Sequence, residues 1–341
     1  MSLRLAFLDD DPVIRLARYI LENREGDPFL AAYFMPESVD LSRTISAARG
    51  ITRRDGIDVF LADAEVSDAD IVILRRGAID EAFLRANPRL RLVVKLGERL
   101  DDIALGAVRN AGCRVVNISR RTLDYTAEHA ILLMLALGKR LVAADALVRK
   151  GSENGDSLDG VAYNWCNLQH LRGLSGHTLG LIGLGEVGSR VARFARCFGM
   201  RVLYYKRSPL SRQDEDDLQA AYAPLDELLA ASDYVSLHVS YTKANEKLIG
   251  ESAFSAMRGD AFFINTSRGR LVDEDALYEA LSQGRIAGAG LDTHGIEPRA
   301  PDDRFSRLDN VIMTPHIAGG ARSGILDELE DIFGHIHSVA G

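Results

Sequence analysis

A chain of 341 residues, 47% of them hydrophobic and 26% charged, has the composition of an ordinary globular protein, and its length favours two domains. Its net charge of −8 argues against nucleic acid as a partner, because phosphate contacts need a basic surface. Cys113, Cys166 and Cys197 are too widely spaced for a metal site, and no apolar run is long enough for a membrane span or a signal peptide, so we expect a cytoplasmic protein.

Strand-like and helical patterns alternate over the first hundred residues. Apolar runs of strand length lie at 3–8, 69–74 and 90–96, and the acidic turn Asp9-Asp10-Asp11 closes the first of them. A short helical pattern at 79–86 separates the second run from the third. This alternation predicts a parallel sheet covered by helices.

One long helix is predicted next. From Leu123 to Val148 the apolar residues follow the helical period closely, and a helix of this length can bridge two domains. Residues 151–173, which include Trp165, are rich in glycine, asparagine and serine, and this composition predicts a surface loop.

A cleaner alternation begins after this loop. Six strand-like runs cover 179–182, 202–205, 234–238, 261–264, 287–291 and 311–313. Helical patterns lie between them at 187–198, 225–231, 251–257 and 274–282, and a last helix is predicted at 325–339. Six strands with crossover helices predict a doubly wound parallel sheet, and we expect no regulatory domain after the last helix.

A glycine-rich turn joins the first of these strands to its helix. Gly183, Gly185 and Gly188 match the G-x-G-x-x-G pattern of dinucleotide-binding proteins. In that pattern the glycines permit the tight turn, the backbone's approach to a pyrophosphate, and close packing of strand and helix. The pyrophosphate lies at the helix N-terminus, where N–H groups favour an anion. An ordinary strand–helix turn is the alternative, but the strand before it and the helix after it favour a nucleotide.

The end of the next strand indicates which nucleotide binds. NAD-binding proteins usually place a carboxylate there for the ribose hydroxyls. This chain has Lys206-Arg207-Ser208 instead, and a basic pair attracts the additional 2′-phosphate of NADP. We therefore predict a preference for NADP over NAD, with a solvated basic loop in an NAD-using protein as the alternative.

Four stretches resemble one family, the D-isomer-specific 2-hydroxyacid dehydrogenases, which include glyoxylate and hydroxypyruvate reductases. They are LGLIGLGEVG at 179–188, INTSRGRLVD at 264–273, GLD at 290–292 followed by Glu297-Pro298, and TPHIAGG at 314–320. Ala127-Glu128-His129 is similar to the start of the family's helix between domains. The order and spacing of these stretches are more specific than any one of them.

The resemblance implies an α/β fold of two Rossmann-like domains, each with a doubly wound parallel sheet. Residues 1–119 and 317–341 would form a flavodoxin-like substrate-binding domain, and residues 120–316 would form the NAD(P)-binding domain. The family is usually dimeric through the cofactor domain, so we expect a homodimer in which the helix from Leu123 takes part. A core helix between two domains is the alternative for that segment.

The resemblance also implies three catalytic residues, Arg268, Glu297 and His316. Interconversion of a 2-hydroxy acid and a 2-keto acid moves a hydride at carbon 2 and a proton at the oxygen. His316 can exchange the proton near neutral pH, and a carboxylate at Glu297 favours the protonated imidazole. Arg268 can bind the substrate carboxylate through its planar fork. Singly, each could be a surface or structural residue; together, after a dinucleotide turn, they favour catalysis.

Further cofactor positions follow from the same resemblance. Ser240 stands where the family usually has proline, and Asp292 stands at the strand end that positions the nicotinamide amide. The expected cofactor contacts are Gly183, Gly185, Glu186, Val187, Gly188, Lys206, Arg207, Ser208, Val239, Ser240, Thr242, Thr266, Ser267, Asp292 and Gly319.

The substrate loop departs from the family, which commonly holds the carboxylate on a Gly-x-Gly segment. This chain has Lys95-Leu96-Gly97 followed by Glu98 and Arg99. Arg75, next to Arg76 after an earlier strand, could reach the same site. The expected contacts of an acidic or phosphorylated substrate are Arg75, Lys95, Leu96, Gly97 and Arg268, with surface charge as the alternative for the basic residues of the first hundred.

Together these features predict a reductase of small 2-keto acids such as glyoxylate or hydroxypyruvate. Phosphoglycerate dehydrogenase is an alternative, because Arg75 and Arg76 suit a phosphate. Formate dehydrogenase fits less well, since that relative carries glutamine at the position of Glu297. A non-enzymatic corepressor that senses nucleotides can keep the same three residues, so a turnover assay must decide.

Overall fold

The computed structural model describes residues 3–22, 58–61, 66–151, 167–320 and 322–340, together with residues 24, 27, 28, 42, 44–46 and 164. The chain forms two compact units, Met1–Thr122 with Ala321–Gly341 (unit 1) and Leu123–Gly320 (unit 2). The sequence predicted divisions after residues 119 and 316 instead. The predicted loop at 151–173 falls mostly outside the described residues, as do Trp165 and Cys166.

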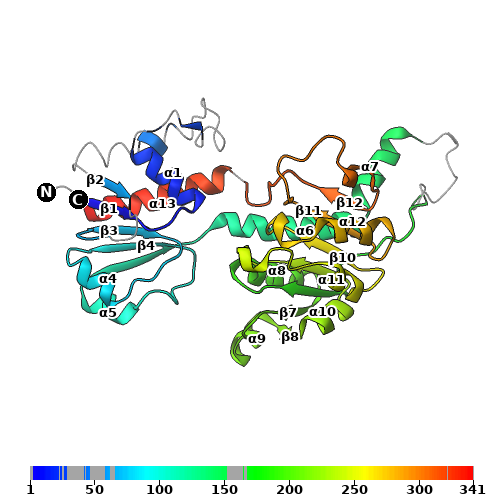
Figure 1. The fold of residues 1–341 in the computed structure, drawn as a ribbon, viewed down its shortest axis with the longest axis horizontal. Coiled ribbons are helices and arrows are strands. Elements are labelled where there is room, and N and C mark those ends of the chain that lie inside the picture. Colours follow the sequence, from blue (N-terminus) through cyan, green and yellow to red (C-terminus); the bar gives the residue numbers. More distant parts are fainter. Residues whose placement is uncertain are drawn as a thin grey trace. The chain divides into compact units, whose positions relative to one another are not determined.

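Unit 1 contains a five-stranded parallel sheet in the order β2-β1-β3-β4-β5 (Figure 1). Its strands are β1 (Arg4–Phe7), β2 (Asp58–Leu61), β3 (Ile71–Leu74), β4 (Leu92–Leu96) and β5 (Arg114–Ile118). The apolar runs predicted β1, β3 and β4, which are the inner strands. They missed the two edge strands, and in β5 only Ile118 is buried, so the apolar signal there is weak.

Helices cover both faces of this sheet (Figure 1). α1 (Pro12–Leu21) and α13 (Arg322–Ala340) pack on one face, against strand residues such as Leu5 and Ile73. α4 (Glu81–Ala86) and α5 (Leu105–Asn110) lie on the other face, toward which Ala6 and Val72 point. Because strand side chains alternate between faces, each apolar strand contributes to two cores.

The predicted long helix is two helices, α6 (Arg121–Gly138) and α7 (Leu141–Lys150). The carbonyl of Gly138 accepts the N–H of Arg172 at 2.8 Å, and Arg140 turns the chain with a φ of +50°. α6 contributes a buried apolar stripe to the core of unit 2, whereas α7 has no buried side chain. The apolar period continues through the break, which explains why the sequence predicted a single helix.

Unit 2 contains a seven-stranded parallel sheet in the order β12-β11-β10-β9-β6-β7-β8. Its strands are β6 (Thr178–Ile182), β7 (Arg201–Tyr205), β8 (Ala220–Tyr222), β9 (Tyr234–Leu237), β10 (Phe262–Asn265), β11 (Gly288–Leu291) and β12 (Val311–Met313). Six of these were predicted; β8 was missed because an edge strand of three residues leaves little apolar pattern. The two sheets confirm the predicted fold class, α/β with two doubly wound parallel sheets.

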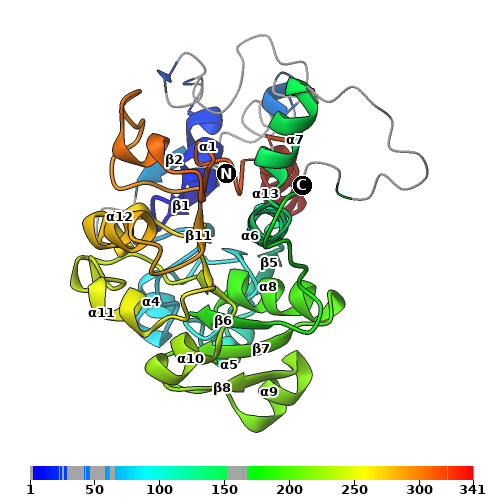
Figure 2. The same cartoon turned by 90° about the vertical axis from the view of Figure 1, so that its right-hand side faces the viewer.

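Helices again cover both faces of the sheet (Figure 2). α6 and α8 (Glu186–Cys197) lie on one face, and α10 (Leu225–Ala231), α11 (Glu251–Ala256) and α12 (Glu274–Ser282) lie on the other. The remaining elements are α9 (Arg212–Leu218), η1 (Lys243–Asn245), η2 (Gly269–Leu271) and η3 (Arg304–Arg307). Because the strands run parallel, the segments that follow them meet along one edge of the sheet, where such folds bind ligands.

Within the described ranges, every helix is too short or too polar to cross a lipid bilayer.

Candidate active site

The glycine turn between β6 and α8 has the shape that a dinucleotide requires. Gly183 has a φ of +96°, and a Cβ there would lie 2.5 Å from the carbonyl oxygen of His238. A Cβ at Gly188 would overlap the carbonyl of Gly183, whereas Gly185 faces open space. α8 begins at Glu186, directly after this turn. The turn therefore combines close backbone approach with a helix N-terminus, as a pyrophosphate needs.

The basic segment Lys206-Arg207-Ser208 follows the carboxyl end of β7, next to the glycine turn. The N–H of Gly183 donates to the carbonyl of Tyr205 at 2.9 Å, so the two segments are neighbours. The hydroxyl of Tyr204 accepts the N–H of Leu210 at 2.8 Å and closes the loop that carries the basic pair. This loop therefore lies at the edge where the cofactor is predicted to bind.

Two buried hydroxyls at the same edge have no hydrogen-bond partner among the residues that the structure describes. They belong to Thr266, just after β10, and Thr293, shortly after β11. Ser267 differs, because its hydroxyl donates to the carbonyl of Leu237 at 2.6 Å and so stabilises the loop. A buried hydroxyl without a partner costs free energy, so the polar groups of a bound molecule are suitable partners. With the glycine turn, the hydroxyl of Thr266 fits a nicotinamide dinucleotide.

The loop after β9 holds three more of the predicted cofactor residues. Asn245 donates from Nδ2 to the carbonyl of Ser240 at 2.9 Å, and its Oδ1 accepts the N–H of Thr242 at 2.7 Å. Asn245 thus fixes the loop at Ser240, where the resemblance leads us to expect proline. Val239 in this loop and Gly319 in the loop after β12 are both half-buried.

One cavity of about 210 Å³ brings the predicted catalytic residues together. Its lining residues are Tyr241, Arg268, Gly269, Arg270, His294, Gly295, Glu297 and His316. The side chains of His316 and Glu297 are 42% and 36% exposed, so a small molecule can reach both. Arg268 is exposed as well. The three residues that the resemblance singled out therefore lie around one cavity of unit 2.

His316 and Glu297 form a hydrogen-bonded pair, with 2.8 Å between Nδ1 of the imidazole and Oε2 of the carboxylate. Oε1 of Glu297 accepts the main-chain N–H of His294 at 2.8 Å. Burial raises the pKa of Glu297, but the hydrogen bonds from His316 and His294 lower it by more, so its pKa lies below the usual value. The carboxylate is therefore ionised at neutral pH, and Nε2 is the ring nitrogen of His316 that Glu297 leaves unbound.

A buried carboxylate supports the turn that carries His316. His316 has a φ of +54°, which is unusual for a residue with a side chain. Asp292 is fully buried and accepts the N–H groups of Ile317 and Ala318, each at 2.9 Å. It also accepts the hydroxyl of Thr314 at 2.6 Å. Asp292 therefore supports the turn from inside the protein, and its contact with the nicotinamide stays a prediction.

Arg268 follows β10 in a loop that packs directly against the loop carrying Glu297. Nη1 of Arg268 donates to the carbonyl of Ser267 at 2.6 Å, and Nδ2 of Asn265 donates to the carbonyl of Arg268 at 3.1 Å. A Cβ at Gly269 would overlap the main chain of His294-Gly295. The two loops are therefore in backbone contact.

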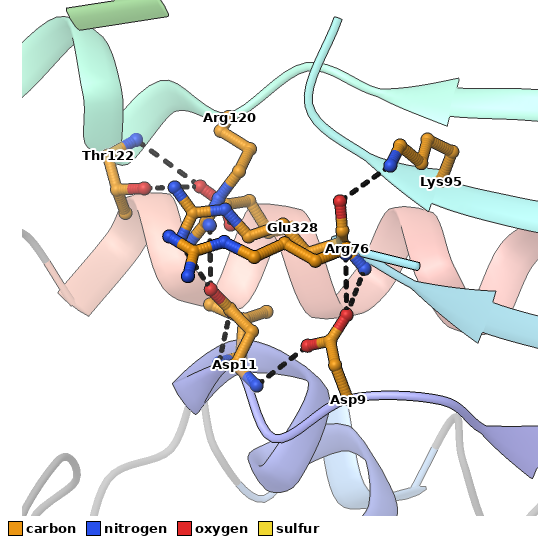
Figure 3. A network of polar contacts seen from close by, with 9 residues as sticks. Asp9, Asp11, Arg76, Lys95, Arg120, Thr122 and Glu328 are labelled. Atoms are coloured by element: carbon orange, nitrogen blue, oxygen red, sulfur yellow. Dashed lines mark hydrogen bonds and ion pairs between the residues drawn. The ribbon is translucent and has the colours of Figure 1, made fainter. Parts of the chain in front are cut away.

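Two of the predicted substrate residues of unit 1, Lys95 and Gly97, bind other groups of that unit, and Figure 3 shows Lys95. Lys95 is buried, and its ammonium donates to the carbonyl of Arg75 at 2.6 Å and to Asp102 at 2.7 Å. The structure thus binds the charge of Lys95 within unit 1, where the sequence predicted a contact with the substrate. The N–H of Gly97 is also engaged, since it donates to the carbonyl of Ile118 at 2.9 Å.

Arg75 binds an ionic network at the carboxyl ends of β1 and β3. Figure 3 shows the members Asp11, Arg120 and Glu328. Asp11 accepts from Arg75 at 2.7 Å and from Arg120 at 2.9 Å. Arg120 also donates to Glu328 on α13 at 3.2 Å, and Glu328 accepts the hydroxyl of Thr122 at 2.7 Å. The side chains of Asp11, Arg120 and Glu328 are 3%, 7% and 1% exposed, whereas that of Arg75 is 28% exposed.

Five residues of the cavity wall were not predicted: Tyr241, Gly269, Arg270, His294 and Gly295. His294 stands between Asp292 and Glu297, inside one of the stretches that carry the resemblance. Its place between these two motif residues was the sequence feature that could have indicated a role for His294. Its partners Glu297 and Arg299 lie three and five residues further along the same loop, whereas Thr314 lies 20 residues away, and no sequence pattern reveals these contacts.

Comparison with known proteins gives the same family at the level of sequence and fold. The chain matches the model of the D-isomer specific 2-hydroxyacid dehydrogenase, NAD binding domain, over residues 131–318. It is 40% identical over 259 residues to a protein named glyoxylate reductase from Korarchaeum cryptofilum, and the match covers 75% of each chain.

Two solved structures extend the similarity to nearly the whole chain. One is an acyclic imino acid reductase (Bsp5) in complex with NADPH and D-Arg, with 26% identity, a TM-score of 0.57 and 98% of each chain covered. The other is D-lactate dehydrogenase from Aquifex aeolicus complexed with NAD and lactic acid, with 28% identity and a TM-score of 0.56. That match covers 98% of this chain and 94% of the other.

The family model covers more than half of the chain, and its match contains the glycine turn and the cavity residues. The relative that is 40% identical covers three quarters of the chain. The chain therefore belongs to the D-isomer specific 2-hydroxyacid dehydrogenases and is an NAD(P)-dependent oxidoreductase that exchanges a hydride with carbon 2 of a 2-hydroxy or 2-keto acid.

Proposed function

We propose that this enzyme reduces glyoxylate or a similarly small 2-keto acid, such as hydroxypyruvate, with Arg268, Glu297 and His316 as its catalytic residues. The observation that carries the proposal is the cavity of about 210 Å³, whose wall contains a hydrogen-bonded histidine–carboxylate pair and an exposed arginine. A cavity of this size suits an acid of a few heavy atoms. The similarity to a glyoxylate reductase supports the same choice.

The residues of the cavity can perform the proton chemistry of this reduction. When bound, the nicotinamide supplies the hydride for carbon 2. His316 gives a proton from Nε2 to the keto oxygen, while Nδ1 stays hydrogen-bonded to the ionised Glu297, which stabilises the imidazolium before transfer. Arg268 leaves the carbonyl of Ser267 and binds the substrate carboxylate. In the oxidative direction His316 takes the proton back.

In unit 1 we retain Arg75 as a proposed substrate contact, because its guanidinium is 28% exposed. The backbone at Leu96 and Gly97 also remains a proposed contact. For Gly97 the N–H would first have to leave the carbonyl of Ile118. Lys95 is no longer part of the proposed set, because its ammonium is bound within unit 1.

The test of this function is a turnover assay with NADPH and three acids: glyoxylate, hydroxypyruvate and 3-phosphohydroxypyruvate. We expect one of the first two to have the highest kcat/KM. The highest kcat/KM for the phosphorylated acid would instead identify a phosphoglycerate dehydrogenase. Tight NADPH binding without turnover of any acid would favour a nucleotide-sensing protein.

We also propose NADP as the preferred cofactor, with NAD as the alternative. The support is the basic pair Lys206 and Arg207, which follows β7 where NAD-binding proteins usually place a carboxylate. We expect kcat/KM to be higher with NADPH than with NADH. Replacing both basic residues by alanine should lower that ratio by about tenfold or more, because a charge-assisted hydrogen bond contributes about 1.5–3 kcal/mol. A higher kcat/KM with NADH in the unmodified enzyme would refute the preference.

We propose a homodimer in which α7 lies in the contact. On this helix Leu141, Val142, Leu147 and Val148 are 53%, 62%, 38% and 58% exposed, and a cluster of exposed apolar side chains indicates a contact surface. Light scattering should give twice the mass of one chain for the unmodified protein. The double variant Val142→Asp, Val148→Asp should give the mass of one chain. A single mass for the unmodified protein would refute the dimer. The cytoplasmic location stays a prediction from the sequence.

A further inference from the structure

His294 lines the cavity, binds Glu297 directly and shares the carbonyl of Thr314 with His316. Its main-chain N–H donates to Oε1 of Glu297 at 2.8 Å. Its ring lies 2.9 Å from the carbonyl oxygen of Thr314 through Nε2, and 2.8 Å from Nε of Arg299 through Nδ1. The carbonyl of Thr314 also accepts the main-chain N–H of His316 at 3.0 Å. One residue therefore joins the loop after β11 to the turn that carries His316.

The partners of the His294 ring define its protonation state. A guanidinium only donates, so Nδ1 must carry the lone pair that accepts from Arg299. A carbonyl only accepts, so Nε2 must carry the proton that is donated to Thr314. The ring is therefore neutral, with its proton on Nε2. His316 has opposite surroundings, because its Nδ1 faces the carboxylate of Glu297.

Arg299 is fixed in the orientation that imposes this tautomer. Its side chain is 13% exposed and pairs with Glu274 on α12 and, at 2.8 Å, with Asp303. Glu274 also accepts the N–H of Gly295, the residue after His294, at 3.0 Å. The guanidinium and the main chain beside the ring are thus held by the same carboxylate. A rotation of Arg299 away from Nδ1 would break these ion pairs.

We propose that His294, as this neutral tautomer, is a positioning residue that holds Glu297 and the turn of His316 in the arrangement needed for proton exchange. The proposal rests on the proposed catalytic roles of Glu297 and His316. A φ of +54° at His316 costs free energy and persists only where the surroundings fix it. Asp292 binds the backbone after His316, and His294 binds the carbonyl of Thr314 before it.

Three substitutions separate the two ring contacts while keeping the main-chain N–H that binds Glu297. His294→Gln can donate to Thr314 from the place of Nε2, His294→Asn can accept from Arg299 at the place of Nδ1, and His294→Phe can do neither. We expect kcat to fall by about tenfold or more for the Phe and Asn variants, because small misplacements of catalytic groups are costly. His294→Gln should retain most of kcat, and the Kd for NADPH should be unchanged in all three.

His177→Phe is the matched control. His177 lies before the amino end of β6, at the opposite edge of the sheet from the cavity, and its Nδ1 lies 3.2 Å from the carbonyl of Ser175. Its kcat should equal that of the unmodified enzyme. The proposal is overturned if His294→Phe behaves like this control, if His294→Asn retains more kcat than His294→Gln, or if NADPH affinity falls as much as kcat.

Nitrogen-15 NMR of histidine-labelled enzyme reads the tautomer without any turnover. At pH 7 the spectrum should contain the signals of a neutral ring with its proton on Nε2. These signals should be missing for His294→Phe, and in Arg299→Met they should change to those of a mixture of the two neutral tautomers. A protonated ring, or a proton on Nδ1, would overturn the assignment.

The two proposals fail in different ways. If the unmodified enzyme turns over no 2-keto acid, the proposed function is wrong, and if His316→Ala keeps full turnover, the proposed role of His316 is wrong; the NMR signal of His294 remains in both cases. If His316→Ala is inactive and His294→Phe is fully active, only the positioning role is wrong.

Discussion

Units 1 and 2 each contain a cluster of charged side chains, and the two clusters differ in what surrounds them. In unit 1, Asp11, Arg120 and Glu328 are buried, and each is bound by other groups of the unit. In unit 2, His316 and Glu297 bind each other but keep more than a third of their side-chain surface exposed to the cavity region.

This difference separates charges that hold the fold from charges that can act on a ligand. A buried charged group whose partners all belong to the protein keeps those partners, because the loss of one would leave a buried charge unpaired. A group that is open on one side can take a substrate as its next partner. Lys95 and Arg120 belong to the first class, and His316 belongs to the second.

The largest expected effect separates activity from stability in unit 2. His316→Ala removes the proposed proton donor, so kcat should fall by about 10²–10⁴-fold. The free energy of unfolding should change by less than about 1 kcal/mol, because the pair with Glu297 is well exposed. NADPH oxidation and urea unfolding measure the two quantities. Unchanged turnover would remove His316 from the proposed mechanism.

The next largest effect should appear in unit 1 as lost stability. Arg120→Met leaves the carboxylates of Asp11 and Glu328 buried without their shared cation, and breaking such a pair costs about 3–5 kcal/mol. Urea unfolding measures this loss. Arg121→Ala is the control, because Arg121 pairs with Asp327 at 2.9 Å while both side chains are largely exposed. Equal, small losses for the two variants would show that burial does not distinguish the networks.

Acid should weaken unit 2 before unit 1. Burial lowers the pKa of His238 from its ordinary 6.5 to about 4. Between these values the unfolded chain binds a proton that the folded chain does not. The stabilisation is therefore complete above pH 6.5 and falls toward pH 4, by at most about 1.4 kcal/mol per pH unit.

In unit 1 the pH-dependent stabilisation comes from a carboxylate, Asp11, and not from a neutral histidine. It is lost in a lower pH range. Burial raises the pKa of Asp11, but Arg120 and Arg75 lower it by more, so its stabilisation is present above pH 3.8 and is lost only below that value. Urea unfolding from pH 7 to pH 4, with pulsed hydrogen exchange, follows each unit separately. His238→Asn should flatten the slope for unit 2. A unit 2 midpoint that stays constant over this range would contradict the assignment.

Much of the fold could be predicted because the inner strands carry continuous apolar runs. β3, β4 and β6 were found within two residues of their ends. Edge strands such as β8 are short or half-exposed and lack that signal. The break at Arg140 was also missed, because the apolar period of α6 continues into α7.

Only those residues of the candidate site that lie in sequence motifs could be predicted. Arg268, Glu297 and His316 stand in recognisable stretches, and the structure brings them to one cavity. Lys95 was assigned to the substrate because a sequence shows a charge but not its partner, Asp102, which lies across a turn. His294 was missed for the same reason, since the sequence does not show that its ring binds Arg299 of the same loop and the carbonyl of Thr314 after β12.

The smallest expected effect tests whether backbone packing sets the geometry of the cavity. Gly269→Ala places a methyl group against the main chain of His294-Gly295, and such overpacking costs about 1–3 kcal/mol. The shift should also displace Glu297 and lower kcat. Gly173→Ala is the control in the same unit, because a Cβ at Gly173 meets nothing within 4 Å. Lost stability with unchanged kcat would mean that this contact holds the loops together without positioning Glu297.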